Sequence, residues 1–222
     1  MYMANKKIRL GVNIDHIAFI KTSRETLYPN LLDAVRISED AGADLITIHL
    51  REDRRHIQDK DATEIRQYAK VLNFEMANTD EMIKFAMELK PNYCCIVPEK
   101  REEKTTEGGL NLTSYSNTQL KKLELTISNF KMNNIKTSLF IDPNHESINI
   151  AADVGAELVE LHTGKYANLF NTIDEFEALE EVSSASKYAH AKNLLVNAGH
   201  GLNYENLSEI CKLNHINEIN IG

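Results

Sequence analysis

The chain has 222 residues, of which 42% are hydrophobic, so it can bury one sizeable core. Its net charge of -8 argues against a nucleic-acid-binding protein, because affinity for a phosphate backbone depends on a basic surface. The sequence has no apolar stretch long enough for a signal peptide or a membrane span, and Cys94, Cys95 and Cys211 match neither a disulfide framework nor a zinc spacing. We therefore expect a single cytoplasmic domain over residues 1–222, with no nucleic-acid or membrane partner.

Short apolar runs alternate with helical patterns along the chain. The alternation predicts a parallel sheet, and eight runs are the number that closes a barrel. The predicted strands are residues 9–15, 45–50, 73–77, 93–97, 137–142, 158–163, 194–198 and 218–222.

The segments between these runs carry residues typical of helix ends. The first predicted helix begins at Pro29 and ends at Gly42, the second has a capping box of Asp61 with Glu64, and the third is capped by Thr79 and stopped by Pro91. The fourth has the apolar stripe Leu120, Leu123, Ile127 and Phe130. The fifth begins at Asn144 and ends at Gly155, the sixth has a capping box of Thr172 with Glu175, and the seventh covers residues 203–213.

Two stretches of the chain repeat one pattern. AGADLITIHL at residues 41–50 and VGAELVELHT at 154–163 share a helix-ending Gly, an Ala, an acid, an apolar strand and a His. They are the second and sixth predicted strands, so His49 and His162 should end strands related by the pseudo-symmetry of an eightfold barrel. A doubly wound open sheet does not require this correspondence, and the Gly-rich nucleotide fingerprint is absent. We therefore favour a (β/α)8 TIM barrel.

Polar residues end every predicted strand, where the active sites of such barrels lie. His49 and His200 are the stronger catalytic candidates, because packing does not explain the neighbouring Arg51 or the glycines around His200. Any one candidate has a structural alternative. The strand-end candidates are Asn13, Asp15, His16, His49, Arg51, Glu75, Glu99, Asp142, Glu160, His162, Asn197, His200, Asn220 and Gly222.

Three of these candidates need separate interpretations. Glu75 lies within an apolar strand, where burial would raise its pKa towards acid/base use, although a salt-bridged structural Glu is the alternative. For His162 alone a hydrogen-bonded structural role is favoured, and turn chemistry or helix capping explains Asp142.

Metal and covalent chemistry have little support. The sequence has no HxH pair on one strand and no HExxH helix, so we expect no metal. Lys100 and Lys165 lie beyond their strand ends, which disfavours a Schiff base. The irregular segment 99–118 is either a ligand-covering loop or a solvated excursion.

Eight motifs, in this order, resemble the pyridoxine 5′-phosphate synthase family. They are GVNIDHIA (11–18), HLREDRRHI (49–57), EMA (75–77), KP (90–91), CCIVPEKREEKTTEGG (94–109), SLFID (138–142), ELHTG (160–164) and NAGHGL (197–202). The resemblance implies a barrel enzyme that condenses 1-deoxy-D-xylulose 5-phosphate with 3-amino-2-oxopropyl phosphate. The products would be pyridoxine 5′-phosphate, inorganic phosphate and water, with no metal or organic cofactor, in a homo-octamer.

The resemblance also implies residue roles. His49 and Glu75 would accept protons, His200 would donate one, and Glu160 would stabilise charge in the transition state. The positions that match substrate-binding residues are Asp15, His16, Arg51, His56 and Thr105 for the deoxyxylulose phosphate, and Asn13, Arg24, Gly201 and Gly222 for the amino-ketone phosphate.

The chain departs from the family at its end. It stops at Gly222, whereas the family continues with a His and a closing helix, so the last barrel helix is missing from this sequence. We expect an omitted tail, because a barrel that exposes this much apolar strand should be unstable. Alternative functions are another phosphate-substrate barrel enzyme, such as an aldolase or isomerase, and a catalytically inactive binding barrel.

Overall fold

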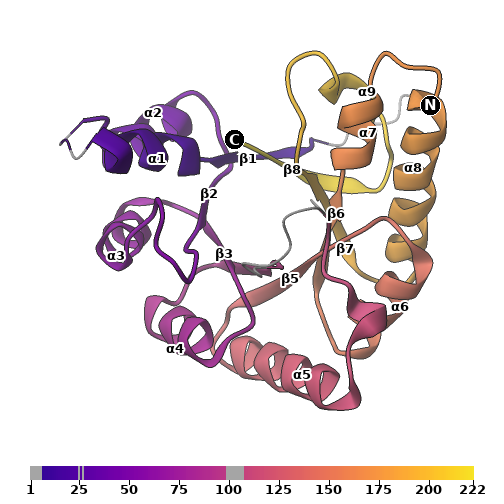
Figure 1. Ribbon diagram of the computed structural model, residues 1–222, viewed down its shortest axis with the longest axis horizontal. Helices are drawn as coiled ribbons and strands as arrows, with labels where there is room; N and C mark the ends of the chain where they lie inside the picture. Colours follow the sequence, from indigo (N-terminus) through magenta and orange to yellow (C-terminus); the bar gives the residue numbers. More distant parts are fainter. Residues whose placement is uncertain (1–6, 25, 27, 99–107) are drawn as a thin grey trace.

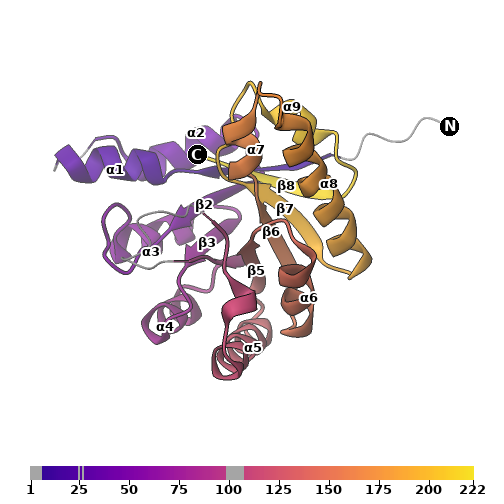
Figure 2. The same ribbon diagram turned by 45° about the vertical axis from the view of Figure 1, so that its right-hand side comes forward.

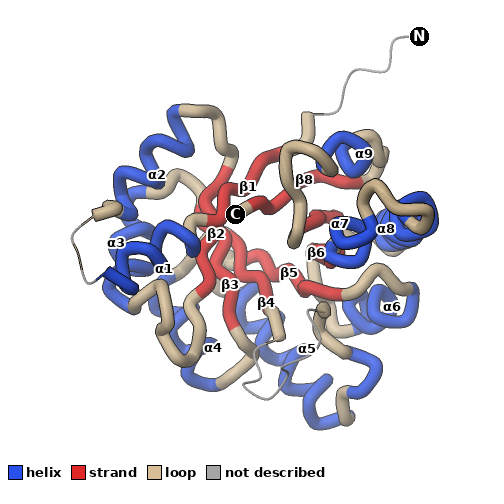
Figure 3. The backbone as a smooth tube through the Cα atoms, turned by 45° about the horizontal axis from the view of Figure 1, so that its top comes forward, coloured by secondary structure: helices blue, strands red, loops and turns tan. Residues whose placement is uncertain are grey.

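The computed structural model describes residues 7–24, 26, 28–98 and 108–222. Eight parallel strands pair in chain order and β8 pairs with β1, which closes a barrel inside a ring of helices (Figures 1 and 3). This confirms the predicted TIM barrel. The strands are β1 (Arg9–Asn13), β2 (Leu45–His49), β3 (Leu72–Met76), β4 (Tyr93–Ile96), β5 (Lys136–Ile141), β6 (Leu158–His162), β7 (Leu195–Gly199) and β8 (Ile216–Ile221).

The helices pack around this barrel, and several predicted caps are confirmed. Thr79 accepts a hydrogen bond from the backbone N–H of Met82 at 3.4 Å, and Asn144 accepts one from Ser147 at 2.8 Å. The helices are α1 (Asp15–Arg24), α2 (Leu31–Asp40), α3 (Asp59–Tyr68), α4 (Asp80–Leu89), α5 (Asn117–Met132), α6 (His145–Asp153), α7 (Gly164–Leu169), α8 (Glu175–Ala191) and α9 (Leu207–Cys211), with a 3-10 turn at Leu112–Ser114.

Both predicted capping boxes are wrong in position. Helix α3 begins two residues before Asp61, so the Asp61 carboxylate lies inside the first turn and accepts from the backbone N–H of Gln58 at 3.1 Å. Helix α8 begins at Glu175, whose carboxylate accepts from the N–H of Asn171. Acidic residues favour the whole first turn, so their sequence position alone does not fix the cap.

Two helices were not predicted, and one is shorter than predicted. Strand β1 ends at Asn13 rather than Asp15, because the Asn13 side chain accepts a hydrogen bond from the Asp15 N–H at 2.8 Å as α1 begins. Helix α1 then projects away from the strands (Figure 2). Helix α7 follows β6 directly, and α9 covers only part of the predicted range 203–213.

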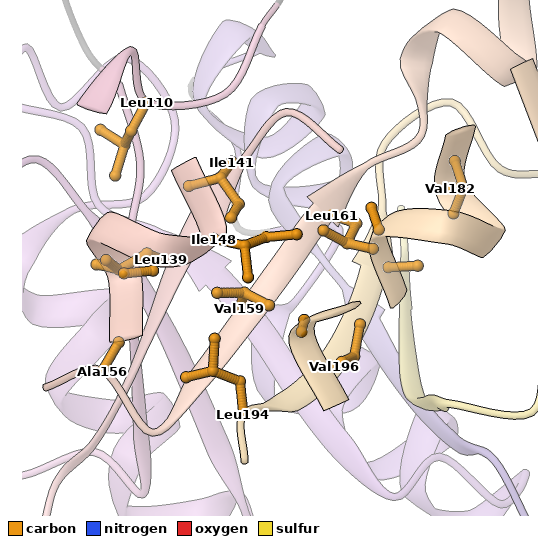
Figure 4. Packing of buried hydrophobic residues seen from close by; sticks show 14 of the residues in the cluster. Leu110, Leu139, Ile141, Ile148, Ala156, Val159, Leu161, Val182, Leu194 and Val196 are labelled. Atoms are coloured by element: carbon orange, nitrogen blue, oxygen red, sulfur yellow. The ribbon is translucent and has the colours of Figure 1, made fainter. Parts of the chain in front are cut away.

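The apolar core lies between the strands and the surrounding helices. One cluster packs β4 to β8 against the helices beside them, with Val159, Leu161 and Ile148 fully buried (Figure 4). A second cluster packs β2 and β3 against α2, α3 and α4. Burial of these side chains removes apolar surface from water, which is the main force that closes the barrel. None of the described helices has the length and apolar character needed to cross a membrane.

Candidate functional site

A cavity of about 910 Å³ opens at the carboxyl ends of the barrel strands. This volume suits a small-molecule ligand. Its walls include residues from the ends of six strands and from the loops that follow them. The polar and aromatic residues that line it are Asn13, Asp15, His16, Phe19, His49, Arg51, Arg55, His56, Glu75, Phe140, Glu160, His162, His200 and Asn220, with Gly108, Gly201 and Gly222.

Strands β2 and β3 bring together an imidazole and a buried carboxyl group. His49 pairs with Glu75 in the parallel register, and His49 Nδ1 lies 4.0 Å from Glu75 Oε2. Asp15, at the start of α1, accepts the backbone N–H of His49 at 3.0 Å and the Asn13 side-chain amide at 3.0 Å. Hydrogen bonds therefore tie the ends of β1 and β2 together around this pair.

Two carboxyl groups in the cavity have raised pKa values. Burial, with smaller contributions from the charges of Glu160 and Asp15, raises the pKa of Glu75 well above its usual value. Burial and then the charge of Glu218 raise the pKa of Glu160 to about 8. Carboxyl groups with raised pKa values are common at sites of proton transfer.

A polar network inside the barrel holds Glu160 from below. The side-chain amide of Asn220 donates a hydrogen bond to Glu160 Oε2 at 2.9 Å. The Thr47 hydroxyl donates to Asn220 Oδ1 at 2.9 Å, which fixes the orientation of that side-chain amide. One layer deeper, Glu218 accepts from Asn197 at 2.9 Å and pairs with Arg9 at 3.3 Å.

The loop after β2 lines the cavity with three basic side chains, Arg51, Arg55 and His56, which together are called the cationic wall. Arg51 and Arg55 both lie beside Asp53, whose pKa the hydrogen bond from Arg55 lowers to about 2. Burial is the largest cause of the lowered pKa of His56, and the charges of the two arginines add to it. Arg54 pairs with Asp59 and Glu81, so of the three arginines in this loop only Arg51 and Arg55 line the cavity.

The loop after β7 presents His200 in an unusual backbone conformation. Its φ of 83° is rare for a residue with a side chain, and Thr163 fixes it by donating from its hydroxyl to the His200 carbonyl at 2.7 Å. Gly201 follows with a φ of 75°, and a Cβ there would lie 2.7 Å from Ala167. Such strain is typical of functional sites.

Strand β6 ends at His162, which confirms the predicted equivalence with His49 at the end of β2. His162 Nδ1 lies 3.3 Å from Asp142 Oδ1, and that oxygen also accepts the N–H of Gly109 at 2.9 Å. Helix capping does not explain Asp142, because Asn144 caps α6, but the predicted turn is present, since the Asp142 carbonyl accepts the N–H of Asn144 at 2.7 Å. Asp142 also joins His162 to the backbone next to Gly108.

The structure brings most of the predicted site residues to this cavity, but Arg24, Asp142 and Asn197 do not line it. Arg24 ends α1, about 13 Å along the helix from Asp15, and does not line the cavity of its own chain. Thr105 lies outside the described residues, as do Glu99 and the central part of the predicted loop 99–118.

Sequence reasoning missed several cavity residues. Phe19 lies one turn into the unpredicted helix α1, and Phe140 lines the cavity from strand β5. Arg55 was left without a role. Arg55 follows Arg51 and Arg54 in one basic segment, and that clustering of arginines was the sequence signal for it.

Three side chains could hold a cation. Ligand atoms of Asp15, His49 and Glu75 all lie within 4.8 Å of one another. Both Asp15 oxygens already accept protein hydrogen bonds, and Glu75 tends to retain a proton. The expectation that the protein uses no metal therefore remains a prediction.

The family model described as pyridoxal phosphate biosynthesis protein PdxJ matches residues 10–222. The chain belongs to this family. It is 48% identical over 216 residues to a pyridoxine 5′-phosphate synthase of Thioalkalivibrio sulfidiphilus, covering 97% of this chain and 86% of the relative. It is 47% identical over 214 residues to one of Prochlorococcus marinus, covering 96% and 88%. The resemblance noted in the sequence is thereby confirmed.

Solved structures with little sequence similarity share the fold. The YdjI aldolase from Escherichia coli K12 has a TM-score of 0.58 at 12% identity, covering 96% of this chain and 75% of that one. A putative fructose-1,6-biphosphate aldolase from Coccidioides immitis has a TM-score of 0.53 at 14% identity, covering 96% and 72%. At this level of identity the likeness concerns the barrel alone.

Proposed function

We propose that this chain condenses 1-deoxy-D-xylulose 5-phosphate with 3-amino-2-oxopropyl phosphate to give pyridoxine 5′-phosphate, inorganic phosphate and water. The observation that carries the proposal is the match to PdxJ over residues 10–222, together with a cavity that gathers every described residue assigned by the resemblance except Arg24.

Binding two phosphorylated substrates requires positive charge and N–H donors. Arg51 and His56, which the resemblance assigns to the deoxyxylulose phosphate, lie on the cationic wall, and Arg55 adds a third basic side chain. Guanidinium groups suit phosphate because their planar N–H donors can bind two oxygens at once. Gly201 and Gly222, which the resemblance assigns to the amino-ketone phosphate, also line the cavity.

The acid/base groups suit imine formation, elimination and ring closure. His49 beside Glu75 can accept protons, and His200 can donate one from its fixed position. Burial raises the pKa of Glu75 well above its usual value. A bound ammonium or imine nitrogen would lower this pKa, so that Glu75 becomes a base when substrate is present. Glu160, which accepts a hydrogen bond from Asn220, would stabilise charge in the transition state, as the resemblance implies.

The test is to incubate the purified protein with both substrates and to follow pyridoxine 5′-phosphate and inorganic phosphate. The wild type should form both, and His49→Ala, Glu75→Gln and His200→Ala should each be slower. A wild type that makes no product would overturn the proposal. Dialysis against a chelator should leave the rate unchanged, and a loss restored by added metal would contradict metal-independent chemistry.

Arg24 bears on the proposed homo-octamer. If Arg24 contacts a substrate phosphate, either α1 moves or another copy of the chain supplies the side chain, because Arg24 does not line its own cavity. Mixing Arg24→Ala with His49→Ala subunits distinguishes these cases. Restored activity in mixed oligomers would support supply from a second copy, and the absence of restoration would support action within one chain. Light scattering should give the mass of an octamer.

We also propose a single domain located in the cytoplasm, where small phosphorylated metabolites are available. The runner-up is another phosphate-substrate barrel enzyme, such as an aldolase or isomerase. Among the described residues, no lysine lines the cavity, which disfavours a Schiff-base mechanism. An aldolase would cleave or form a C–C bond without consuming both substrates. A binding barrel would bind them without turnover.

A further inference from the structure

His162 is an imidazole of the cavity wall to which the family resemblance gives no role. Its side chain is almost fully buried, with 6% of the residue exposed, and its ring lines the cavity. Nδ1 lies 3.3 Å from Asp142 Oδ1. No hydrogen bond joins Nε2 to any protein group in the described part of the chain. A buried ring with one nitrogen held and the other available is typical of an acid/base group.

Asp142 determines which nitrogen of His162 carries the proton in the neutral ring. The hydrogen bond with His162 is the largest cause of a lowered Asp142 pKa, and the N–H of Gly109 adds to it, so the carboxylate stays ionised. An ionised carboxylate can only accept hydrogen bonds. His162 Nδ1 is therefore the donor, and in the neutral ring Nε2 carries the lone pair.

The groups packed around His162 fix its ring beside the proposed proton donor. The ring centroid lies 4.9 Å from that of His200 and 5.2 Å from that of Phe140, which packs edge to face. A Cβ at Gly164, the first residue of α7, would lie 2.6 Å from Nε2, so only glycine leaves the ring in place. Among the described residues, the titratable groups that contact the ring are Asp142, the residue after β5, and His200, from the loop after β7.

We propose that His162 is a further catalytic residue of the condensation, in which Nε2 carries out one proton transfer while Asp142 holds Nδ1. This rests on the proposed function. In a dehydration step, Nε2 accepts the proton from a substrate C–H bond, and the electron pair of that bond forms the new double bond. The C–O bond breaks with its electrons on oxygen, and the imidazolium returns the proton so that water leaves. His162 ends the step neutral, and no other reactant is required.

Two amide substitutions separate proton transfer from hydrogen bonding. His162→Asn keeps an N–H donor near the position of Nδ1, where it can still bind Asp142. His162→Gln keeps one near Nε2. Neither amide titrates, so both variants should lose about 10²–10⁴-fold in kcat with a smaller change in KM. Asp142→Asn should lower kcat by a smaller factor. His145→Asn is the matched control, because His145 stacks on Tyr188 outside the cavity and its loss should leave the rate unchanged.

Chemical rescue supplies a result that a structural role would not give. Added imidazole should restore part of the activity of His162→Ala, whereas failure of rescue would argue that the ring is needed only for packing. A His162→Asn variant with wild-type kcat would overturn the proposal. If the variants do not fold, nitrogen NMR of the histidines in the wild type tests the proposal. The neutral His162 ring should carry its proton on Nδ1, and a proton on Nε2 would contradict the proposal. A wild type without product would instead refute the proposed function.

Discussion

The two faces of the barrel strands differ in chemistry. On β3, Phe74 and Met76 face the helices and are fully buried in the apolar cluster, whereas Asn73 and Glu75 alternate with them and face the barrel interior. On β6, Val159 and Leu161 lie in the outer core, and Glu160 between them contacts Asn220 across the interior. Successive side chains along these strands therefore alternate between the apolar core outside the barrel and the polar barrel interior.

The difference shows how stability and function are divided in this fold. Barrel interiors are usually filled by branched apolar side chains. Here the interior contains a connected polar layer in which Asn197 and Asn220 donate hydrogen bonds to the buried carboxyl groups of Glu218 and Glu160, and Thr47 donates to the Asn220 side-chain oxygen. Buried polar groups cost stability unless they are hydrogen-bonded, so the outer apolar layer must offset this cost. Changes inside should impair chemistry, and changes outside should impair folding.

The largest effect should come from the inner face at Glu75. Glu75→Gln removes the titrating group and keeps the volume, so kcat for pyridoxine 5′-phosphate formation should fall by about 10²–10⁴-fold. The free energy of unfolding should change little. Glu88→Gln, at an exposed position of α4, is the control. A Glu75→Gln variant as fast as the wild type would remove Glu75 from the mechanism.

The neighbouring outer position should give the opposite result. Phe74 is fully buried and stacks on Phe85 of α4, with ring centroids 5.8 Å apart. Phe74→Ala should lower the free energy of unfolding by about 3–5 kcal/mol, measured by urea denaturation at fixed protein concentration. The folded fraction should retain most of its kcat. A loss below about 1 kcal/mol would show that the outer layer does not supply the stability assigned to it.

The pH dependence of stability should reveal the buried carboxyl group of Glu160. Its pKa of about 8 exceeds the ordinary value of 4.5, so the folded state binds its proton more tightly than the unfolded state does. This contribution is complete below the unfolded pKa and is lost as pH rises through about 8. The wild type should therefore lose up to a few kcal/mol more than Glu160→Gln between about pH 5 and about pH 9. Equal losses in urea titrations would contradict the raised pKa.

The smallest effect should come from a helix cap outside both layers. Thr79→Ala removes the hydroxyl that accepts the N–H of Met82, and should cost about 0.5–1 kcal/mol of unfolding free energy. Activity should be unchanged, and Thr79→Ser should restore stability because it keeps the oxygen. A loss of activity in Thr79→Ala would show that the outer elements affect the cavity more than the comparison of the two faces implies.

The sequence by itself determined the order and number of strands, because apolar runs and the residues between them are local features. It also indicated His49, Glu75 and His200, because each departs from what packing requires. The repeated pattern correctly placed His49 and His162 at equivalent strand ends. The sequence did not indicate the start of α1, the short helix α7 or the true caps of α3 and α8. Several polar residues near each boundary can act as the helix cap, so the sequence does not select one.

Only the tertiary structure decided which groups meet. Asp142 and His162 end adjacent strands, and their contact depends on the register of β5 with β6 and on the Gly109 backbone that binds the same carboxylate. The pKa of Glu160 likewise depends on Glu218 and Asn220, about sixty residues away in sequence, because burial and charge act through space. The local sequence pattern determines which side chains each strand carries. Closure of the barrel determines which of these side chains come into contact and so which chemistry they perform together.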